Sequence, residues 1–250
     1  MLAEKRRQFI IDKLKEEQSV QVNELSNFLN VSRETVRRDL EKLQNKNLLK
    51  RTHGGAVAIN KKEELSFNTR IKQNIEQKEE IAKKALNYVK NGATIFLDIS
   101  STALIFARKL NIFSELTIIT NSARIVTELA DYKQLTVLST GGLLMSDSIS
   151  FVGPHANSLV NNYFADIFFA SCKGISPTYG ATDSSDLEIE IKESMVKRSN
   201  QVIILADYSK FIERGLSAFA SPDEINTLIT DSSVKSEIKE NFINSGMEIY

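Results

Sequence analysis

The chain has 250 residues, a formal net charge of zero and a hydrophobic fraction of 42%, which suffices for packed cores in one large domain or in a small and a medium one. It has no run of about 18 apolar residues that could span a bilayer. Its N-terminal stretch, MLAEKRRQFI, is charged where a secretory signal would need an apolar core. We therefore expect a globular protein of the cytoplasm. The single cysteine, Cys172, excludes an internal disulfide and a paired-cysteine zinc site, so a buried, reduced thiol is expected.

The two parts of the chain differ in charge. Residues 1–60 carry 12 Lys+Arg against 8 Asp+Glu, whereas the remainder carries 20 against 24. Clustered cations are what the neutralisation of nucleic-acid phosphates requires. This asymmetry favours a small basic domain that binds nucleic acid and a larger acidic domain that binds a different ligand.

Two helices are expected before residue 31. Residues 4–17 predict the first, which would support a DNA-reading helix. Its Arg6 and Arg7 are expected at the solvated surface, with phosphate contact as the alternative. Residues 20–30 (VQVNELSNFLN) predict a second, shorter helix with apolar positions at helical spacing.

Residues 31–43 (VSRETVRRDLEKL) predict a third helix with a well-defined start, because the hydroxyl of Ser32 can accept from the backbone N–H of Thr35. Apolar residues recur at i, i+4 and i+7 and predict one buried stripe; they are Val36, Leu40 and Leu43. The opposite face is polar and cationic, which suits the major groove of DNA; the alternative is an ordinary solvated face. The side chains on that face and its flanks are Arg33, Glu34, Thr35, Arg37, Arg38 and Lys42.

Residues 48–59 (LLKRTHGGAVAI) predict two short strands around a turn at Gly54 and Gly55. Only a few residues separate the second and third helices, as the helix-turn-helix motif requires. A hairpin after that motif is a wing, and its Arg51 and His53 would follow the DNA backbone. The candidate DNA-binding residues are therefore Ser32, Arg33, Thr35, Arg37, Arg38, Lys42, Arg51 and His53.

Two motifs in this part of the chain, VSRETVRRDL at residues 31–40 and LKRTHGGA at residues 49–56, are similar to a known pattern. They resemble the DeoR-type winged helix-turn-helix of bacterial sugar-metabolism regulators. The resemblance implies a DNA-binding domain over residues 1–59. Residues 60–76 show little periodicity and are expected to be a linker to an effector-sensing domain over residues 77–250.

Helices and strands alternate beyond this linker. Residues 77–91 predict a helix that Gly92 ends at its C′ position, where a positive φ is easiest for glycine. Six short apolar runs predict strands that are buried on both faces; they are residues 94–98, 116–120, 135–139, 167–170, 202–206 and 227–230. Helices fit between them at residues 102–110, 123–130, 155–162, 187–199 and 235–244. This alternation is typical of a largely parallel α/β sheet.

Polar groups follow three of these strands at their carboxyl ends, where open parallel sheets bind ligands. They are Ser100, Ser101 and Thr102 after Asp98; Thr120, Asn121 and Ser122; and Gly141 and Gly142 after Thr140. Hydroxyls beside unpaired helix N-terminal N–H groups could hold a phosphate, and the glycines would let a ligand approach the backbone. The alternative is that these Ser, Thr and Asn side chains only cap helices.

Five segments of this second part are similar to the DeoR sensor domain, which itself resembles ribose-5-phosphate isomerase in fold. They are LDISST at residues 97–102, TNS at 120–122, TGG at 140–142, SCKG at 171–174 and LADYSKF at 205–211. The resemblance implies that these loops, Asp98 included, bind a phosphorylated sugar or a related effector. Ser100 stands where the family has glycine, so its Cβ would narrow the space over a phosphate.

Two lysines are the cations expected to meet the effector, because lysine is a compact charge well suited to phosphate. They are Lys173 and Lys210, which could instead form surface ion pairs with Asp183 and Asp207 respectively. Asp207 is expected to orient its loop. The acidic run at residues 183–190 is expected to be a solvated helix start.

These observations favour a transcriptional regulator, a repressor of sugar-metabolism genes that binds operator DNA and responds to a phosphorylated sugar-type effector. Family precedent implies a homodimer or homotetramer. We expect no catalytic residue, metal or cofactor. One alternative is a phosphosugar isomerase with an accessory DNA-binding head, which would need a general base and a group that polarises the carbonyl. A regulator controlled by a protein partner is the other alternative.

Overall fold

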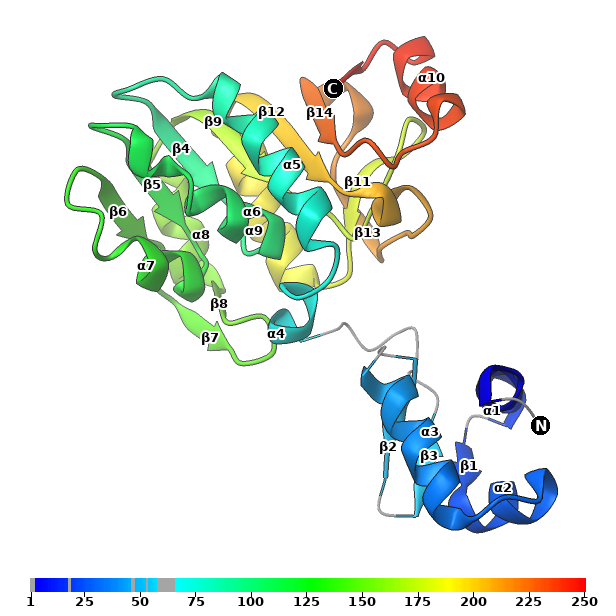
Figure 1. Cartoon of the computed structure of the whole chain (residues 1–250). Helices are drawn as coiled ribbons and strands as arrows, with labels where there is room; N and C mark the ends of the chain where they lie inside the picture. The colour runs from blue at the N-terminus through cyan, green and yellow to red at the C-terminus, as the bar shows by residue number, and fades with distance from the viewer. Residues whose placement is uncertain (1–2, 18, 46–47, 53, 58–65) are drawn as a thin grey trace. The chain divides into compact units, whose positions relative to one another are not determined.

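The computed structural model describes residues 3–17, 19–45, 48–52, 54–57 and 66–250. The chain divides into two compact units, Met1–Glu64 and Leu65–Tyr250, each of which is described by itself (Figure 1). Of the helices in the described ranges, none combines the length and the apolar character needed to cross a membrane.

The first unit joins helices to a small antiparallel sheet. Its described helices are α1 (Ala3–Glu17), α2 (Val22–Leu29) and α3 (Arg33–Asn45). Its described strands are β1 (Ser19–Gln21), β2 (Lys50–Arg51) and β3 (Gly55–Val57). β3 lies between β1 and β2 and pairs antiparallel with both. The predicted helix-turn-helix and wing hairpin are thereby confirmed, with β1 as an additional strand.

The three helices bury their apolar stripes in one core. Val36, Leu40 and Leu43 of α3 are 0%, 1% and 2% exposed, so the predicted stripe is confirmed. The second helix begins later than expected, because Val20 belongs to β1 and pairs with Ala56 of β3. Helical spacing in the sequence cannot reveal this pairing, since the partner strand lies more than thirty residues away.

Arg6 is not at the surface, and both roles considered for it are wrong. It is 8% exposed, and its Nε lies 2.5 Å from Oδ2 of Asp39 on α3. Nη1 of Arg7 lies 3.4 Å from the other oxygen of the same carboxylate. These ion pairs fix α3 against α1. The carboxylate of Asp39, on the buried side of α3, thus pairs with both Arg6 and Arg7, which the sequence analysis expected at the solvated surface or on phosphate.

A parallel sheet of seven strands organises the second unit, with the order β15-β14-β12-β9-β4-β5-β6. All neighbouring strands in it are parallel. The strands are β4 (Thr94–Leu97), β5 (Thr117–Thr120), β6 (Thr136–Ser139), β9 (Ala165–Ala170), β12 (Ser199–Ala206), β14 (Thr227–Thr230) and β15 (Glu248–Ile249). The predicted strands and the parallel α/β class are confirmed. β15 was missed because two residues carry no readable pattern.

Helices connect these strands. They are α4 (Phe67–Arg70), α5 (Ile75–Ala85), α6 (Ser101–Ala107), α7 (Ala123–Leu129), α8 (Pro154–Asn161), α9 (Asp186–Lys197) and α10 (Ser236–Asn244). Short 3-10 helices follow at Leu86–Tyr88, Leu110–Ile112, Tyr208–Phe211 and Pro222–Glu224. The helices predicted at residues 102–110, 123–130, 155–162, 187–199 and 235–244 are confirmed, with shifted ends.

Two expectations near the start of this unit need correction. Residues 66–76, expected within the linker, form α4 and the start of α5, and Phe67 is 2% exposed in the core of the second unit. Gly92 has the expected positive φ of 79°. It is not the C′ residue of α5, however, because that helix ends at Ala85 and passes into a 3-10 turn.

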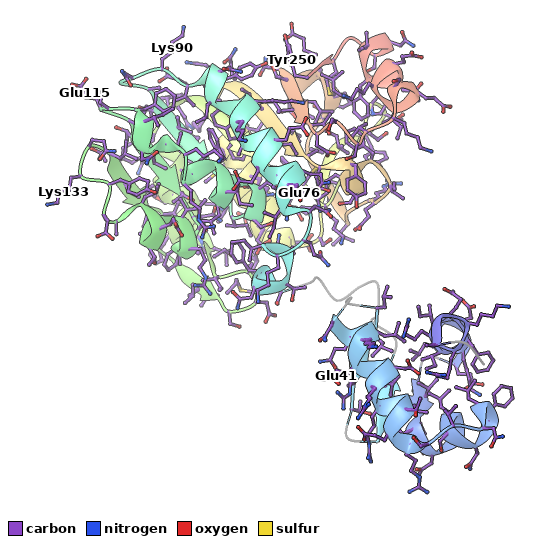
Figure 2. All side chains as sticks on the ribbon, viewed as in Figure 1. Glu41, Glu76, Lys90, Glu115, Lys133 and Tyr250 are labelled. Atoms are coloured by element: carbon purple, nitrogen blue, oxygen red, sulfur yellow. The ribbon has the colours of Figure 1, made fainter. Side chains whose placement is uncertain are left out.

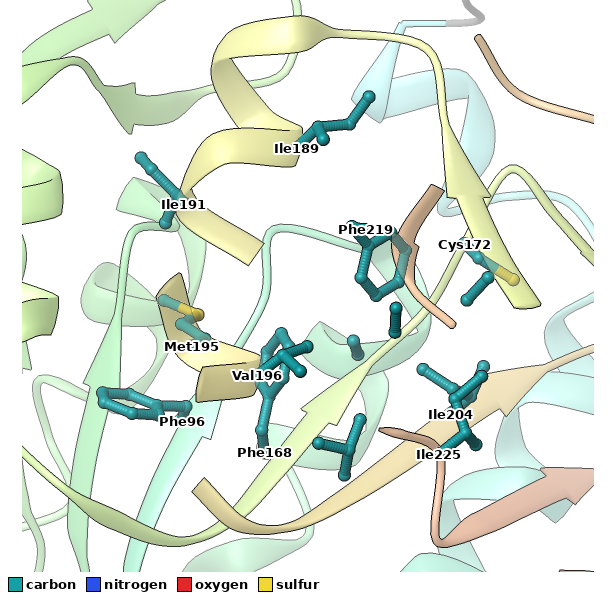
Figure 3. Close-up of a cluster of buried hydrophobic side chains, with 14 of the residues drawn as sticks. Phe96, Phe168, Cys172, Ile189, Ile191, Met195, Val196, Ile204, Phe219 and Ile225 are labelled. Carbon is teal, nitrogen blue, oxygen red and sulfur yellow. The ribbon is translucent and has the colours of Figure 1, made fainter. Parts of the chain in front are cut away.

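Alternate residues of the strands enter two separate cores, one on each face of the sheet. Phe96, Phe168 and Ile204 belong to a core that also holds side chains of α8 and α9. Figure 3 shows Met195 and Val196 of α9 in this core. Ile95, Phe169 and other strand residues contact α5, α6 and α7 on the opposite face, where Figure 1 shows α5 and α6 crossing the sheet. Exposed charged side chains such as those of Lys90, Glu115 and Lys133 project from the outside of this unit (Figure 2). The predicted burial on both faces is therefore confirmed for β4, β5, β9, β12 and β14. It is wrong for the edge strand β6, whose residues are exposed or only partly buried.

Two small antiparallel sheets extend the second unit beyond the sequence prediction. β7 (Leu143–Met145) and β8 (Ser150–Val152) form a hairpin after β6. β10 (Gly174–Ser176), β11 (Gly180–Asp183) and β13 (Ser217–Ala220) form a sheet after β9. Both sheets follow strands at their carboxyl ends, so they hold the loops in which a ligand site was predicted.

Candidate functional sites

The start of α3 has the predicted cap. The backbone N–H of Thr35 donates to Oγ of Ser32 at 3.1 Å, and the two hydroxyl oxygens lie 2.9 Å apart. Val31 packs against the cluster that contains Val36, as a hydrophobic staple requires. This cap fixes the first turn of the helix and places the Ser32 and Thr35 hydroxyls side by side at its N-terminus.

The outer face of α3 is exposed and cationic. Arg33, Arg37, Arg38 and Lys42 are all exposed. Nε of Arg38 lies 3.3 Å from Oε1 of Glu34, in a pair whose side chains are 73% and 63% exposed. A pair this exposed is worth little, so Arg38 can exchange Glu34 for another anion at small cost.

The wing is tied to α3 at its base. The backbone N–H of Arg51 in β2 donates to Oε1 of Gln44 at 3.1 Å, and the Arg51 side chain is exposed. The N–H of Thr52 donates to the carbonyl of Gly55 at 3.0 Å across the turn. His53 lies outside the described residues. The structure thus brings seven of the eight candidate DNA-binding residues to an α3 and wing that share one hydrogen-bonded frame.

The carboxyl ends of five neighbouring strands gather the other candidates. In the order β12-β9-β4-β5-β6, each strand is followed by polar residues at the same edge of the sheet. They are Asp207; Ser171, Cys172 and Lys173; Asp98 to Thr102; Thr120 to Ser122; and Thr140 to Gly142. We call this set the carboxyl-edge cluster.

Asp98 is fully buried and its carboxylate is used within the chain. Oδ1 accepts from the N–H of Ser100 at 3.0 Å, and Oδ2 accepts from the N–H of Ser171 at 3.0 Å. Oδ2 also lies 2.8 Å from Nζ of Lys192. Asp98 therefore holds the loops after β4 and β9 together and leaves little capacity for a ligand.

Two of the predicted serines cap helices, as the alternative interpretation expected. Oγ of Ser100 accepts from the N–H of Ala103 at 3.0 Å, and Oγ of Ser122 accepts from the N–H of Ile125 at 3.3 Å. Each hydroxyl keeps its own proton for donation. Capping therefore does not exclude contact with a ligand.

The loop after β5 is held by its own side chains. Oγ1 of Thr120 accepts from the N–H of Ser122 at 3.0 Å, and Nδ2 of Asn121 donates to the carbonyl of Phe151 at 3.1 Å. Thr102 on α6 is 1% exposed and belongs to the same buried edge. These residues shape the loops from within.

The two glycines after β6 differ in the space that surrounds them. Gly142 has φ 113°, and a Cβ there would lie 2.7 Å from the carbonyl oxygen of Val152. The backbone that approaches Gly142 closely is therefore the chain's own. Gly141 has φ 62° with no atom within 4 Å of an added Cβ, so only Gly141 retains open space of the kind predicted for a ligand.

Lys192 of α9 is a central residue that the sequence analysis missed. Nζ lies 2.8 Å from Asp98 and 2.7 Å from Asp183, and donates to the carbonyl of Ser171 at 2.9 Å. Burial by itself would lower the pKa of Lys192, but the two carboxylates outweigh it and the pKa is raised. Burial would raise the pKa of Asp183, but Lys192 outweighs it and that pKa is lowered. Lys192 and Asp183 are therefore both ionised at neutral pH.

The acidic run at residues 183–190 is therefore only partly solvated. Asp183 is 7% exposed and paired with Lys192, and Glu188 is 3% exposed and accepts from Oγ of Ser150 at 3.2 Å. Asp186 and Glu190 are exposed as expected. A usable signal for Lys192 was present, because it lies three residues after Ile189 and four before Val196, on the apolar stripe of α9.

Lys78 of α5 is a second buried lysine that was missed. Nζ donates to the carbonyl of Arg70 at 2.6 Å, to that of Gln73 at 2.9 Å and to Oγ of Ser101 at 3.0 Å. Burial lowers its pKa to about 8, and the charge of Asp207 offsets only part of that effect. Its position three residues before Ile81, on the apolar face of α5, was again the available signal.

Arg70 of α4 adds a third missed cation. Its guanidinium lies 5.7 Å from the ring centre of Phe67, and within the described part of the chain its buried Nε has no hydrogen-bond partner. The charge of Arg70 contributes to lowering the pKa of both Lys78 and Asp183, so Arg70 lies close enough to interact electrostatically with these two residues. The sequence analysis missed Arg70 because it lies in the segment that was expected to be a linker.

The two predicted lysines, Lys173 and Lys210, follow the neighbouring strands β9 and β12. Nζ of Lys173 is 2.6 Å from Oε2 of Glu213, so its alternative partner Asp183 was wrongly assigned. No ion pair of Lys210 occurs among the residues that the structure describes, because Asp207 Oδ1 accepts instead from Asn74 Nδ2 at 3.0 Å and from Ser209 Oγ at 2.6 Å. Asp207 thus orients its loop, as predicted.

The remaining polar features are structural. Cys172 is a free, buried cysteine, as predicted, and burial raises the pKa of its thiol to about 12. In the described ranges, no group of three His, Cys, Asp or Glu side chains could hold a metal ion. A hollow of about 600 Å³ lies between the β10–β11 turn and α10, lined by residues such as Tyr179 and Phe242. None of the predicted ligand residues lines it.

The first unit is a winged helix-turn-helix with an exposed cationic face. The second unit is a parallel α/β domain with buried cations at the carboxyl edge of its sheet. This combination is typical of a two-part transcriptional regulator. Two family models match the chain, the DeoR-like helix-turn-helix domain over residues 6–62 and the DeoR C terminal sensor domain over residues 73–232. The chain belongs to the DeoR family of DNA-binding transcriptional regulators.

Individual relatives span nearly the whole chain. It is 42% identical to the HTH-type transcriptional regulator YulB of Bacillus subtilis, over 94% of this chain and 91% of that protein. It is 34% identical to the L-fucose operon activator of Escherichia coli, over 90% of this chain and 94% of that protein. Among solved structures, ribose 5-phosphate isomerase A from Methanocaldococcus jannaschii aligns with a TM-score of 0.42 and 20% identity, over 56% and 55% of the two chains.

Proposed function

We propose that this regulator represses genes of sugar metabolism and releases its operator when a phosphorylated sugar-type ligand binds the carboxyl-edge cluster. The observation that carries the ligand half is a set of cations, Arg70, Lys78 and Lys210, beside loops rich in hydroxyl groups. Burial lowers the pKa of Lys78 to about 8, so a ligand anion would relieve an unfavourable charge. Sugar metabolism is supported by the L-fucose operon that one relative activates.

The DNA half of the proposal rests on α3 and the wing. Thr35 and Arg38 would enter the major groove, with Arg33, Arg37 and Lys42 on bases or phosphates and Ser32 at the helix N-terminus. Arg51 would follow the backbone from the wing. His53, predicted beside it, stays part of this proposal on sequence grounds. All four cations of α3 are exposed and therefore accessible to a duplex.

We propose repression and not activation, because repression needs fewer additional contacts. A regulator that occupies an operator overlapping a promoter blocks transcription through its DNA contacts alone. Activation would need a further surface that recruits polymerase. Two copies of the chain would be needed to bind two half-sites, so we propose a homodimer or homotetramer, in which the first unit binds DNA and the second unit binds the effector.

The enzyme alternative is less well supported by the same geometry. An isomerase needs a base that removes a proton from the substrate carbon. Asp98 and Asp183 are both held by Lys192, and Lys78 acts as a donor in three hydrogen bonds. These three groups are thus already committed to partners within the chain.

Calorimetry on the full chain tests the ligand proposal. The titrants are ribose 5-phosphate, fructose 6-phosphate, sugar acids, polyol phosphates and inorganic phosphate. We expect heat with at least one phosphate ester and a matching release of promoter DNA taken from the neighbouring sugar genes, followed by fluorescence anisotropy. Silence against the whole panel, with DNA binding intact, would favour control by a protein partner. Turnover of ribose 5-phosphate without DNA binding would establish the enzyme instead.

A further inference from the structure

One ammonium group connects the carboxyl-edge cluster with the first helix of the second unit. Lys78 Nζ donates to Oγ of Ser101, the first residue of α6 after β4, and it donates to the carbonyls of Arg70 and Gln73 at the end of α4 and in the turn after it. These residues come from three separate elements. No other group joins them in the described hydrogen bonds of the second unit.

The hydrogen-bonding capacity of this ammonium group is fully used. A lysine has three N–H donors and no acceptor, and Lys78 has three acceptors at 2.6, 2.9 and 3.0 Å. Because Ser101 Oγ already accepts from Lys78, its hydroxyl proton is free to donate to a ligand anion. Lys78 thus donates both to the carbonyls at the end of α4 and to Ser101, and Ser101 can donate in turn to the ligand.

The turn between α4 and α5 has a second tie to the cluster. Asn74 takes φ 51° at the start of α5, and its Nδ2 donates to Oδ1 of Asp207 at 3.0 Å. At its other end, α4 is anchored by Phe67, whose N–H donates to the carbonyl of Asp147 at 3.3 Å. Phe67 to Asn74 is therefore a short segment held at both ends, with Lys78 bonded to its middle.

The position of this segment in the chain gives the contact its significance. α4 is the first described helix after the first unit, so every covalent path from the DNA-binding unit to the sensor passes through it. Arg70, whose buried Nε lacks a partner among the described residues, lies on the same helix. An anion in the cluster would thus attract both the lysine that holds α4 and a guanidinium that belongs to it.

We propose that Lys78 is a positioning residue that transmits ligand binding to α4, because one ammonium group bonds both the ligand loop and the end of that helix. This inference rests on the ligand site proposed above. An anion that accepts from Ser101 keeps Lys78 charged and strengthens the bond from Lys78 to Ser101. The carbonyl bonds to Arg70 and Gln73 are then maintained for more of the time, and α4 is more firmly ordered.

Hydrogen–deuterium exchange on the full-length protein tests the proposal, with inorganic phosphate as the probe and sodium chloride of matched ionic strength as the control. In the native sequence, phosphate should slow exchange in the loops at residues 98–103 and 120–125. It should also slow exchange at residues 70–73 of α4 and its turn. Phosphate that protects the loops and leaves residues 70–73 unchanged overturns the inference while the ligand site stands. Absence of loop protection removes the ligand site and the inference with it.

Two variants separate transmission from folding. Lys78→Met removes the ammonium group. Ser101→Ala removes the acceptor of Lys78 at residue 101, together with the hydroxyl that would donate to the ligand, and keeps both carbonyl bonds. At equal phosphate occupancy, judged from loop protection, each variant should lose the α4 response. The Ser101→Ala variant decides the question if Lys78→Met does not fold or bind. An α4 response that persists at native size in Ser101→Ala refutes the proposal.

Lys84→Met is the matched control. Lys84 lies on the same helix and its Nζ also donates to a backbone carbonyl, that of Thr230 at 2.8 Å. It has no bond to α4 or to the ligand loops in the described contacts, and its other partner is Glu80. The variant loses a comparable tether and should keep the α4 response to phosphate.

Discussion

The two units of this protein place their cations in opposite ways. The first unit exposes Arg33, Arg37, Arg38 and Lys42 on one helix face, whereas the second buries Lys78 and Lys192 to 4% exposure each. Exposed cations suit a polyanion such as DNA, whose binding comes from many weak, salt-dependent contacts. Buried cations suit a small anion, because one well-placed charge counts for more away from water. The difference indicates which partner each unit can recognise.

Within the second unit, the two buried lysines differ again. Lys192 is compensated by Asp98 and Asp183, and its pKa is raised. Lys78 is bonded only to neutral oxygens, and burial lowers its pKa to about 8. A compensated charge stabilises the fold and has no need of a ligand. The uncompensated charge is the one that an anionic ligand can complete.

The largest effect expected from this contrast is on stability. Lys192→Met would leave two buried carboxylates without their cation, and the free energy of unfolding should fall by about 3–5 kcal/mol. Lys78→Met removes a charge that burial disfavours and leaves neutral acceptors, so we expect a loss below about 2 kcal/mol. Urea unfolding of the second unit measures both. Equal losses would show that the two lysines are equally structural.

The exposed cations should affect DNA binding and leave folding unchanged. Arg38→Ala should weaken operator binding by about 1–3 kcal/mol if the side chain reads a base. It should leave stability unchanged, because the ion pair of Arg38 with Glu34 is too exposed to contribute to it. Competition anisotropy with operator and random duplexes measures the loss and its specificity. Arg108→Ala, which removes an exposed arginine paired with Glu128 on the second unit, is the control. An unchanged footprint for Arg38→Ala would remove it from the interface.

Ligand binding should be linked to the protonation of Lys78. The pKa of Lys78 is shifted by burial and by the charges of Asp207, Lys210 and Arg70. Because this pKa is about 8, the Lys78 side chain is largely neutral at pH 9. An anion raises that pKa, so binding at pH 9 takes up a proton and affinity falls by up to tenfold, about 1.4 kcal/mol, per pH unit above 8. Calorimetry with inorganic phosphate in two buffers of different ionisation enthalpy measures the uptake. Proton release, or uptake that persists in Lys78→Met, would contradict this linkage.

The smallest effect concerns Ser100, at the position where the resemblance implies a glycine in the family. Ser100 has φ −70° and caps α6, a conformation that suits any residue, so the loop does not need glycine. Ser100→Gly should cost only a few tenths of a kcal/mol, because glycine is a tolerable N-cap. Thermal unfolding measures the change. A loss above about 1 kcal/mol would mean that Oγ of Ser100 does more than cap the helix.

The sequence predicted those parts of the fold that follow from local pattern. The Ser32 cap, the stripe of Val36 and its partners, and the apolar strands were all readable, because each depends on neighbours a few residues away. Val20 in β1 was misassigned, since its pairing with Ala56 is a long-range contact. Arg6 was misassigned for the same reason, because its partner Asp39 lies on another helix.

The candidate site was predicted in part. Loops at the carboxyl ends of strands could be named in advance, because parallel strands must end at one edge. Asp98, Ser100 and Ser122 are in these loops, although their side chains are used by the chain itself. Lys78 and Lys192 were missed because a lysine on an apolar helix face reads as an interruption of the pattern, and Arg70 was missed because it lies in the segment expected to be a linker. Only the burial of such a lysine reveals that it must have partners.

The sequence by itself determined the family, the order of helices and strands, and the residues on the outer face of α3, because periodicity and caps are local properties. The tertiary structure decided which charges are compensated. Lys192 and Lys78 are equivalent in the sequence, each a lysine in a helix. What distinguishes them is that the fold brings two carboxylates to one and only carbonyl and hydroxyl oxygens to the other, and the energy of a buried charge depends on those partners.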